Sequence, residues 1–209
     1  MNAYTFNGIG QINMNSTFGN CIYKIACLDT VTRIFEVGSW NGQGSTICLM
    51  NGVITKNNSI LYSLEADSCM FNISNTFWNK KNTNGSLVLL NGILHNKIAD
   101  LNDLNLLYNN NIPYFNEHYI PEKNLVKTSK IINIDNIEYL DFIILDGGEY
   151  TTQGDYDILM LKSPKYIALD DTAVYKCRII RQLLLNNIDW EIYEENQNER
   201  NGWSVFIKK

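Results

Sequence analysis

Acidic residues follow two strongly apolar runs of the chain. Asp146 comes directly after the apolar letters of "DFIILDGGEY", and Asp170 and Asp171 end the run "YIALDD". If the two runs are adjacent parallel strands, their carboxyl ends meet at one edge of the sheet and the three carboxylates converge. Such carboxylates repel one another unless a cation or protons intervene, and Mg²⁺ prefers oxygen ligands. The three residues are therefore candidate metal ligands; alternatively, one caps the next helix and the others are solvated.

Glycines interrupt the chain between an apolar run and a helical segment in "RIFEVGSWNGQGST". Gly38, Gly42 and Gly44 allow the backbone to approach a ligand closely, and the start of the next helix offers free N–H groups to an anionic part of it. Their spacing is not the G-x-G-x-x-G of dinucleotide sites, which weakens a nicotinamide interpretation. The alternative is a tight turn with incidental glycines.

A single acid ends the second apolar run, "SILYSLEA". In that position Glu65 can accept hydrogen bonds from both ribose hydroxyls of an adenosine-containing ligand. Taken alone, it is equally well explained as a surface acid. Together with the glycine-rich turn, it favours a ligand that carries a nucleoside.

The elements that position these residues alternate between strand and helix, which indicates a mostly parallel sheet in an α/β domain. Strands are predicted at 33–38, 59–66, 85–92, 138–148 and 163–171, and helices at 44–53, 67–81, 98–110, 151–162 and 173–187. Asp67 or Ser68 is the expected N-cap of the second helix. Residues 111–130 have two prolines and no clean period, so a long loop or lid is predicted there. The last strands form an antiparallel hairpin from Trp190 to Lys208.

Length and composition limit the class of protein. The chain has 209 residues, of which 45% are hydrophobic, and this fits one domain with a helix-bearing N-terminal extension over 1–32 and the main domain over 33–209. A net charge of -5 makes nucleic acid an unlikely default partner. Five cysteines without Cys-x-x-Cys spacing imply neither a disulfide framework nor a zinc site. No basic leader and no apolar run near the roughly 18 residues of a membrane span are found, so the cytoplasm is the expected location.

Four segments in order, "FEVGSWNGQGST", "LYSLEAD", "DFIILDGGEY" and "YIALDDT", followed by the hairpin, resemble the class I S-adenosylmethionine-dependent methyltransferases. The resemblance runs from about Arg33 to the C-terminus and is strongest to small-molecule and sugar O-methyltransferases. It implies a Rossmann-like, doubly wound sheet of seven strands with an antiparallel end. The implied activity is methylation of a hydroxyl of a small polyol, a sugar or a glycan end, with divalent-metal assistance from Mg²⁺.

The resemblance also assigns roles to single residues. Gly38, Ser39 and Gly42 are expected along the methionine and ribose part of the cofactor, with Glu36 orienting the loop or the amino group. Ser45 is expected near the cofactor carboxylate and Glu65 at the ribose. The remaining expectations are that Ala66 and Gly92 flank the adenine, and that Asp146 holds the metal together with Asp170 and Asp171.

The position at which similar enzymes carry the general base differs in this sequence. Similar sugar methyltransferases often have Asp-Gly-x-His, and here the last position is Glu149. The candidate catalytic residues are therefore Asp146, Glu149 and His118, with His95 expected nearer the adenine. Lys176 and Arg178 are expected either to hold an anionic acceptor or to pair with the aspartates. Two alternatives remain: a metal-independent small-molecule methyltransferase, and a non-catalytic domain that binds the cofactor.

Overall fold

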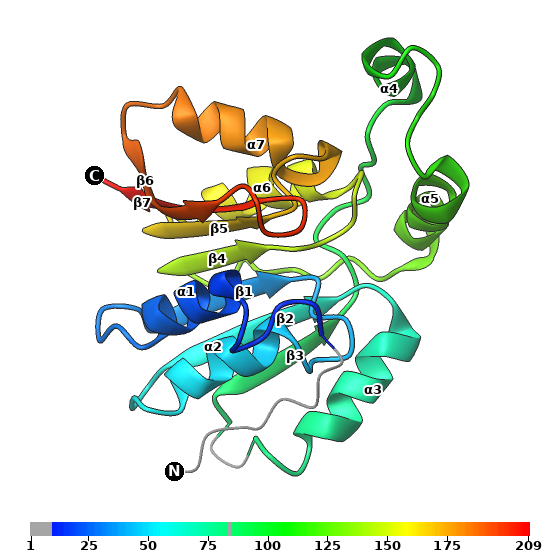
Figure 1. Ribbon diagram of the computed structural model, residues 1–209. Helices are drawn as coiled ribbons and strands as arrows, with labels where there is room; N and C mark the ends of the chain where they lie inside the picture. Colours follow the sequence, from blue (N-terminus) through cyan, green and yellow to red (C-terminus); the bar gives the residue numbers. More distant parts are fainter. Residues whose placement is uncertain (1–9, 83–84) are drawn as a thin grey trace.

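The computed structural model describes residues 10–82 and 85–209 (Figure 1). The strands are β1 (Arg33–Val37), β2 (Ile60–Glu65), β3 (Leu87–Asn91), β4 (Phe142–Leu145), β5 (Tyr166–Asp170), β6 (Trp190–Asn196) and β7 (Trp203–Lys208). Within the described residues they form one seven-stranded sheet in the order β3-β2-β1-β4-β5-β7-β6. β1 to β5 pair with one another in parallel, and β7 is antiparallel to both β5 and β6, so β7 alone of the seven runs in the opposite direction. The predicted α/β fold with a Rossmann-like sheet and a C-terminal antiparallel hairpin is therefore confirmed.

The elements lie close to the predicted ranges. The helices are α1 (Thr17–Ala26), α2 (Ser45–Val53), α3 (Ser68–Trp78), α4 (Leu101–Leu107), η1 (Phe115–Tyr119), α5 (Ile120–Thr128), α6 (Thr152–Met160) and α7 (Tyr175–Leu185). Asp67 is the N-cap of α3, as predicted, and accepts hydrogen bonds from the backbone N–H groups of Cys69 and Met70.

The register of the central strands aligns their carboxyl ends. Val37 of β1 pairs with Leu145 of β4, and Leu145 pairs with Leu169 of β5. The strand order reverses between β1 and β4: β2 and β3 lie on one side of β1, and β4 and β5 lie on the other. Ligands of open α/β sheets bind beyond the carboxyl ends of the strands at such a switch point. The residues that follow β1, β4 and β5 therefore meet at this edge.

Helix α2 is buried along its whole length, because it lies between the sheet and α1. The crossing of α1 and α2 is close at Gly52, where an added Cβ would come within 2.6 Å of the Cβ of Ala26. Phe18, Ile22 and Ile25 of α1 belong to the same hydrophobic core as α2. Residues of the N-terminal segment thus complete this core.

The expectation of a long loop over 111–130 is wrong. The segment contains η1, a single π-helical turn, followed directly by α5, and both stand out with α4 from the end of the sheet (Figure 1). Pro121 lies in the first turn of α5, where a proline is compatible with helix. None of the α5 residues is fully buried, although the carboxyl of Glu122 is largely enclosed, so the helix lacks a buried apolar stripe that would produce a readable period. No described helix is both long and apolar enough to cross a lipid bilayer.

Two glycines with left-handed backbone give a matched test of packing in the loop after β1. At Gly42 (φ +71°) an added Cβ would approach Ser74 Oγ to 2.2 Å and Trp78 Nε1 to 2.8 Å, whereas at Gly85 (φ +69°) it would meet nothing within 4 Å. We expect Gly85→Ala to cost about 1 kcal/mol from backbone strain alone. Gly42→Ala should cost about 2–4 kcal/mol because overpacking adds to the same strain. Urea unfolding of both variants measures the difference, and equal losses would contradict this account of the loop.

Candidate active site

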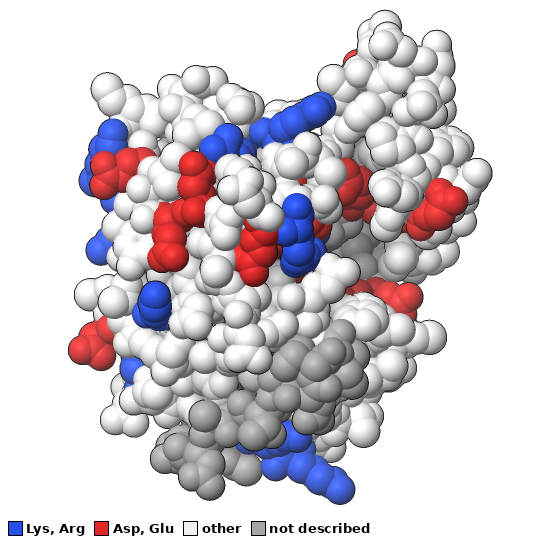
Figure 2. Space-filling model, in the orientation of Figure 1, with Lys and Arg blue, Asp and Glu red and all other residues white. Residues whose placement is uncertain are grey.

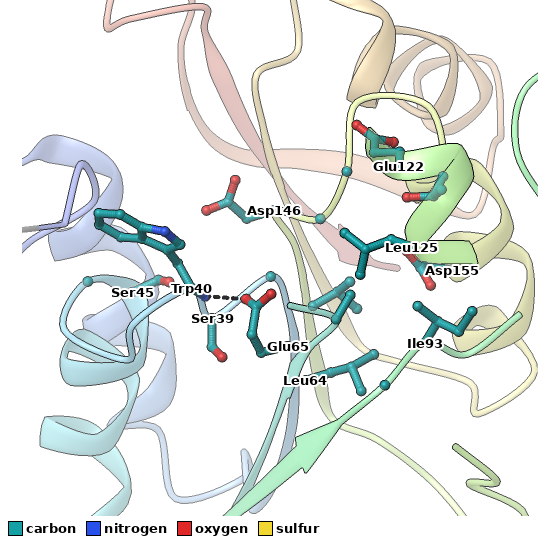
Figure 3. Close-up of a pocket in the computed structure, with 18 of the residues that line it drawn as sticks. Ser39, Trp40, Ser45, Leu64, Glu65, Ile93, Glu122, Leu125, Asp146 and Asp155 are labelled. Carbon is teal, nitrogen blue, oxygen red and sulfur yellow. Dashed lines mark hydrogen bonds between the residues drawn. The ribbon is translucent and has the colours of Figure 1, made fainter. Parts of the chain in front are cut away.

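A cavity of about 610 Å³ opens at the carboxyl edge of β1, β2 and β4 (Figure 3). Many of the predicted site residues line it: Gly38, Ser39, Ser45, Glu65, Ala66, Gly92, His118 and Asp146. The remaining predicted residues lie outside its wall: Glu36, Gly42, Glu149, Asp170 and Asp171. Sequence reasoning missed Glu122, Asp155 and the segment 10–12, all of which line the cavity.

Glu36 lies behind the cavity, inside the sheet, and joins three elements. Its carboxylate accepts hydrogen bonds from the hydroxyls of Ser45 (2.6 Å), Thr46 (2.8 Å) and Ser63 (2.6 Å). Complete burial raises the pKa of Glu36, while the three hydroxyl donors work to lower it. These hydrogen bonds fix the start of α2 against β1 and β2. Glu36 is therefore placed to orient the loop between β1 and α2.

The loop after β1 passes directly over the end of β4. Gly38 has φ +86°, and an added Cβ would lie 2.0 Å from the carbonyl oxygen of Asp146, so only glycine fits there. The N–H groups of Gly38 and Ser39 both donate to the carbonyl of Leu64. Gly42, which was expected beside the ligand, lies against α3 instead, and Gly44 takes its place in the cavity wall.

Helix α2 begins at the cavity with Gly44 as its N-cap. Among the described residues, no side chain caps its first turn. The backbone N–H groups at a helix start, together with the positive end of the helix dipole, make this a suitable position for an anionic group such as a carboxylate. The hydroxyl of Ser45 is already engaged by Glu36, so the backbone is the available donor.

Glu65 is held in place at the end of β2. Its Oε2 accepts the N–H of Trp40 at 2.6 Å (dashed in Figure 3), and its Oε1 accepts the N–H of Asp67 at 2.8 Å. Each oxygen keeps a further lone pair for a ligand. Burial raises the pKa of Glu65 to about 7, although the backbone donors work against it. The indole of Trp40 is 48% exposed at the cavity, and its backbone is left-handed with φ +48°.

Glu122 attaches α5 to the loop that follows β4. Its two carboxylate oxygens accept the N–H groups of Glu149 (2.7 Å) and Tyr150 (2.8 Å). Gly148 makes room for this contact, since an added Cβ there would lie 2.5 Å from Glu122 Oε2. Burial raises the pKa of Glu122 to about 7. In Figure 3, Glu122 and Leu125 of α5 face Trp40 and Glu65 across the cavity.

The three predicted metal ligands come together, with ligand oxygens of Asp146, Asp170 and Asp171 within 4.8 Å of one another. Lys176 Nζ lies among them, 2.7 Å from Asp146 and 2.6 Å from Asp171, and Arg200 Nη2 lies 3.0 Å from Asp170. Burial, followed by the charge of Asp146, raises the pKa of Asp170 to about 8. Burial also acts to raise the pKa of Asp171, but Lys176 and Arg200 hold it below its ordinary value.

The other candidate bases occupy different positions. Glu149 lies behind the wall, where its carboxylate accepts the backbone N–H of Lys176 at 3.2 Å, and burial raises its pKa. His118 lines the cavity from η1, with its ring edge-on to Tyr114. His95 also lines the cavity, with its Nε2 3.3 Å from Asp155 Oδ1. Of these three, only the histidines have access to a ligand.

The wall of the cavity is acidic. Among the described lining residues, four carry carboxylates (Glu65, Glu122, Asp146 and Asp155), two are histidines and none is lysine or arginine. Such a wall favours a ligand with positive charge and hydroxyl donors, and it disfavours one with several phosphates. On the face shown in Figure 2, outside the grey residues, basic and acidic side chains are interspersed and form no extended basic patch.

Comparison with known proteins identifies the fold. No family model matches the chain, and no curated protein matches it in sequence. An O-methyltransferase from Bacillus cereus in complex with SAH (S-adenosylhomocysteine) is 16% identical, with a TM-score of 0.61, over 93% of this chain and 82% of that one. TomG, an O-methyltransferase from Streptomyces achromogenes involved in tomaymycin synthesis and solved with SAM, is 12% identical, with a TM-score of 0.60, over 91% of this chain and 79% of that one.

A third similar structure is the SAH-bound methyltransferase PaMTH1 from Podospora anserina. It is 13% identical, with a TM-score of 0.57, over 91% of this chain and 77% of that one. The fold of this chain is therefore that of the class I S-adenosylmethionine-dependent O-methyltransferases.

The raised pKa of Glu122 predicts a pH dependence of stability. A carboxyl whose pKa is about 7 in the folded chain and ordinary in the unfolded chain binds its proton more tightly when folded. Its stabilising contribution is present below the unfolded pKa of about 4.3 and is lost as the pH rises through 7. We expect the free energy of unfolding to fall by about 2 kcal/mol less between pH 5 and pH 8 in Glu122→Gln than in the wild type.

Urea unfolding at four pH values measures this slope. Glu191→Gln, at an exposed position of β6, controls for the loss of one charge. The slope is compared rather than the absolute stability, because glutamine cannot accept both backbone N–H groups. Identical slopes in wild type and Glu122→Gln would show that the buried carboxyl does not titrate in this range.

Proposed function

We propose that the chain is an S-adenosylmethionine-dependent O-methyltransferase that methylates a hydroxyl of a small neutral polyol, such as a sugar or a glycan end. The observation that carries the proposal is Glu65, whose carboxylate is fixed by two backbone donors at the end of β2 and lines a cavity in this fold. A carboxylate in that position accepts both hydroxyls of a ribose.

The residues around Glu65 fit the other parts of the cofactor. The uncapped start of α2 suits its carboxylate, and the loop at Gly38 and Ser39 allows close approach of its methionine part. Ala66, Gly92 and Ile93 form the wall on the β3 side, where we place the adenine. When bound, S-adenosylmethionine supplies a methyl group on a positively charged sulfur, and the acidic wall stabilises that charge.

The acceptor is inferred from the rest of the wall. The carboxylate of Asp146 can accept a hydrogen bond from a hydroxyl and so orient its oxygen. Trp40 presents a half-exposed indole whose flat face can pack against the apolar face of a sugar ring. The lack of lysine and arginine among the described wall residues leaves an anionic acceptor without a partner. These features together favour a neutral polyol.

Proton removal from the acceptor requires a base at the cavity. We assign this role to His118, because it lines the cavity and histidine is the side chain that most often serves as a general base. Asp146 is paired with Lys176 and is better suited to orienting the hydroxyl than to removing its proton. Glu149 lies behind the wall, so its proposed contribution is indirect, through the backbone of Lys176.

The proposed location follows from the thiols. All five cysteines are unpaired, which suits a reducing compartment, and we propose the cytoplasm.

The alternative of a domain that binds the cofactor without turnover is distinguished from an enzyme by product formation. An acceptor screen that follows SAH release in the presence of sugars and polyols distinguishes the two.

The proposed function predicts that SAH binds with micromolar affinity and releases protons. Ribose hydroxyls that donate to Glu65 favour its ionised form, so a carboxyl with pKa of about 7 gives up about half a proton at pH 7. Calorimetric titration in two buffers of different ionisation enthalpy measures this release. Glu65→Gln should bind about 10- to 100-fold more weakly and release none, because charge-assisted hydrogen bonds are lost.

Glu191→Gln is the matched control and should behave as the wild type does. Absence of SAH binding by the folded wild type would contradict the proposal. Binding of NAD in its place would assign the glycine-rich loop to a dehydrogenase.

A further inference from the structure

The cluster of Asp146, Asp170 and Asp171 contains its own cations, and the proposed function does not yet account for them. We propose that the ammonium of Lys176 takes the place of the divalent ion, so that this chain transfers its methyl group without a metal. Lys176 is then a positioning residue that neutralises and orients Asp146, the one member of the cluster on the cavity wall. The inference rests on the proposed function for its meaning but can be tested separately.

The geometry places the ammonium where a metal would bind. Lys176 Nζ lies 2.7 Å from Asp146 Oδ1, 2.6 Å from Asp171 Oδ2 and 3.9 Å from Asp170 Oδ2, so it faces all three carboxylates. Mg²⁺ would have to approach the same oxygens to about 2.1 Å and would therefore meet the ammonium directly. The residues present do not fit a divalent ion while Lys176 keeps this position.

Lys176 is held at both ends. Its side chain is only 8% exposed, and its backbone N–H donates to the carboxylate of Glu149 at 3.2 Å. The residue lies in the first turn of α7, directly before the buried Cys177. To admit a metal, the ammonium would have to break two close ion pairs and leave a buried position, and removing one partner from such a group is costly.

The other side of the cluster is also filled. Arg200 Nη2 lies 3.0 Å from Asp170 Oδ2, an ion pair without hydrogen-bond alignment, and 3.5 Å from Asp171 Oδ1. The side-chain amide of Asn201 donates to the same oxygen of Asp171 at 3.1 Å. Two resident cations therefore face three carboxylates, which leaves too little uncompensated negative charge for tight binding of a divalent ion.

Titration with Mn²⁺, an oxygen-preferring probe, tests the inference through metal binding rather than activity. Electron paramagnetic resonance follows the titration, and the wild type should bind Mn²⁺ no more tightly than millimolar. Its affinity for SAH should be equal in EDTA and in MgCl₂. Lys176→Met removes the charge but keeps the length of the side chain. It should gain a site that binds Mn²⁺ at least about 10-fold more tightly, whereas Lys24→Met, at an exposed position of α1, should not.

One-to-one binding of Mn²⁺ by the wild type at micromolar concentration, lost in Asp171→Asn, would overturn the inference. A folded Lys176→Met variant that binds no Mn²⁺ would also overturn it. If that variant does not fold, the wild-type titration decides alone: no binding supports the inference and micromolar binding overturns it. SAH binding by the wild type is measured in the same buffers, so failure of the proposed function is recognised independently.

Discussion

Carboxylates gathered at one edge of a parallel sheet are the constraint on which the rest of this structure depends. Parallel strands deliver the acids that end them to the same place, and burial makes each ionised carboxylate costly unless it finds donors. The chain meets this cost in three ways. Glu36 has three hydroxyl donors, Glu65 has two backbone N–H groups, and the aspartates after β4 and β5 have Lys176 and Arg200.

Each solution also shapes the cavity. The hydroxyl donors of Glu36 fix the start of α2, and this helix start lines the cavity. Trp40, which donates its N–H to Glu65, has a left-handed backbone and a partly exposed indole at the cavity. Glu122 does the same for α5 by accepting two N–H groups from the loop after β4. The hydrogen bonds that satisfy the buried carboxylates therefore also position the walls of the cavity.

The sequence predicted those features that depend on local pattern. Buried strands such as β4 are short apolar runs, the N-cap of α3 is an aspartate before a helical period, and the convergence of Asp146 with Asp170 follows from strand ends alone. Helix α5 was missed because none of its residues is fully buried and its sequence therefore shows no clear helical period. Nothing in the local sequence distinguishes Glu122 from any other acid in a polar segment.

The remaining differences between the sequence predictions and the structure depend on tertiary contacts. Gly42 lies against Trp78, which is 36 positions away in the sequence, and its neighbour Gly44 faces the cavity. Sequence alone did not choose between Lys176 and Arg178 as a partner of the aspartates or of an anionic acceptor. Of the two, Lys176 lies among the carboxylates, and this depends on how α7 begins beside β4 and β5. The order of the strands predicts at which edge of the sheet each strand ends. It does not predict which side chain packs beside that end.

A crystal structure of the protein grown with SAH and MnCl₂ tests the central claim most directly, because it shows the nucleoside and, by anomalous scattering, the metal. The account predicts SAH in the cavity with its ribose hydroxyls on Glu65, and the ammonium of Lys176 between Asp146 and Asp171 with no manganese signal there. A nucleoside bound away from Glu65 would contradict the proposed methyltransferase site. Manganese held by the three aspartates would contradict the role given to Lys176.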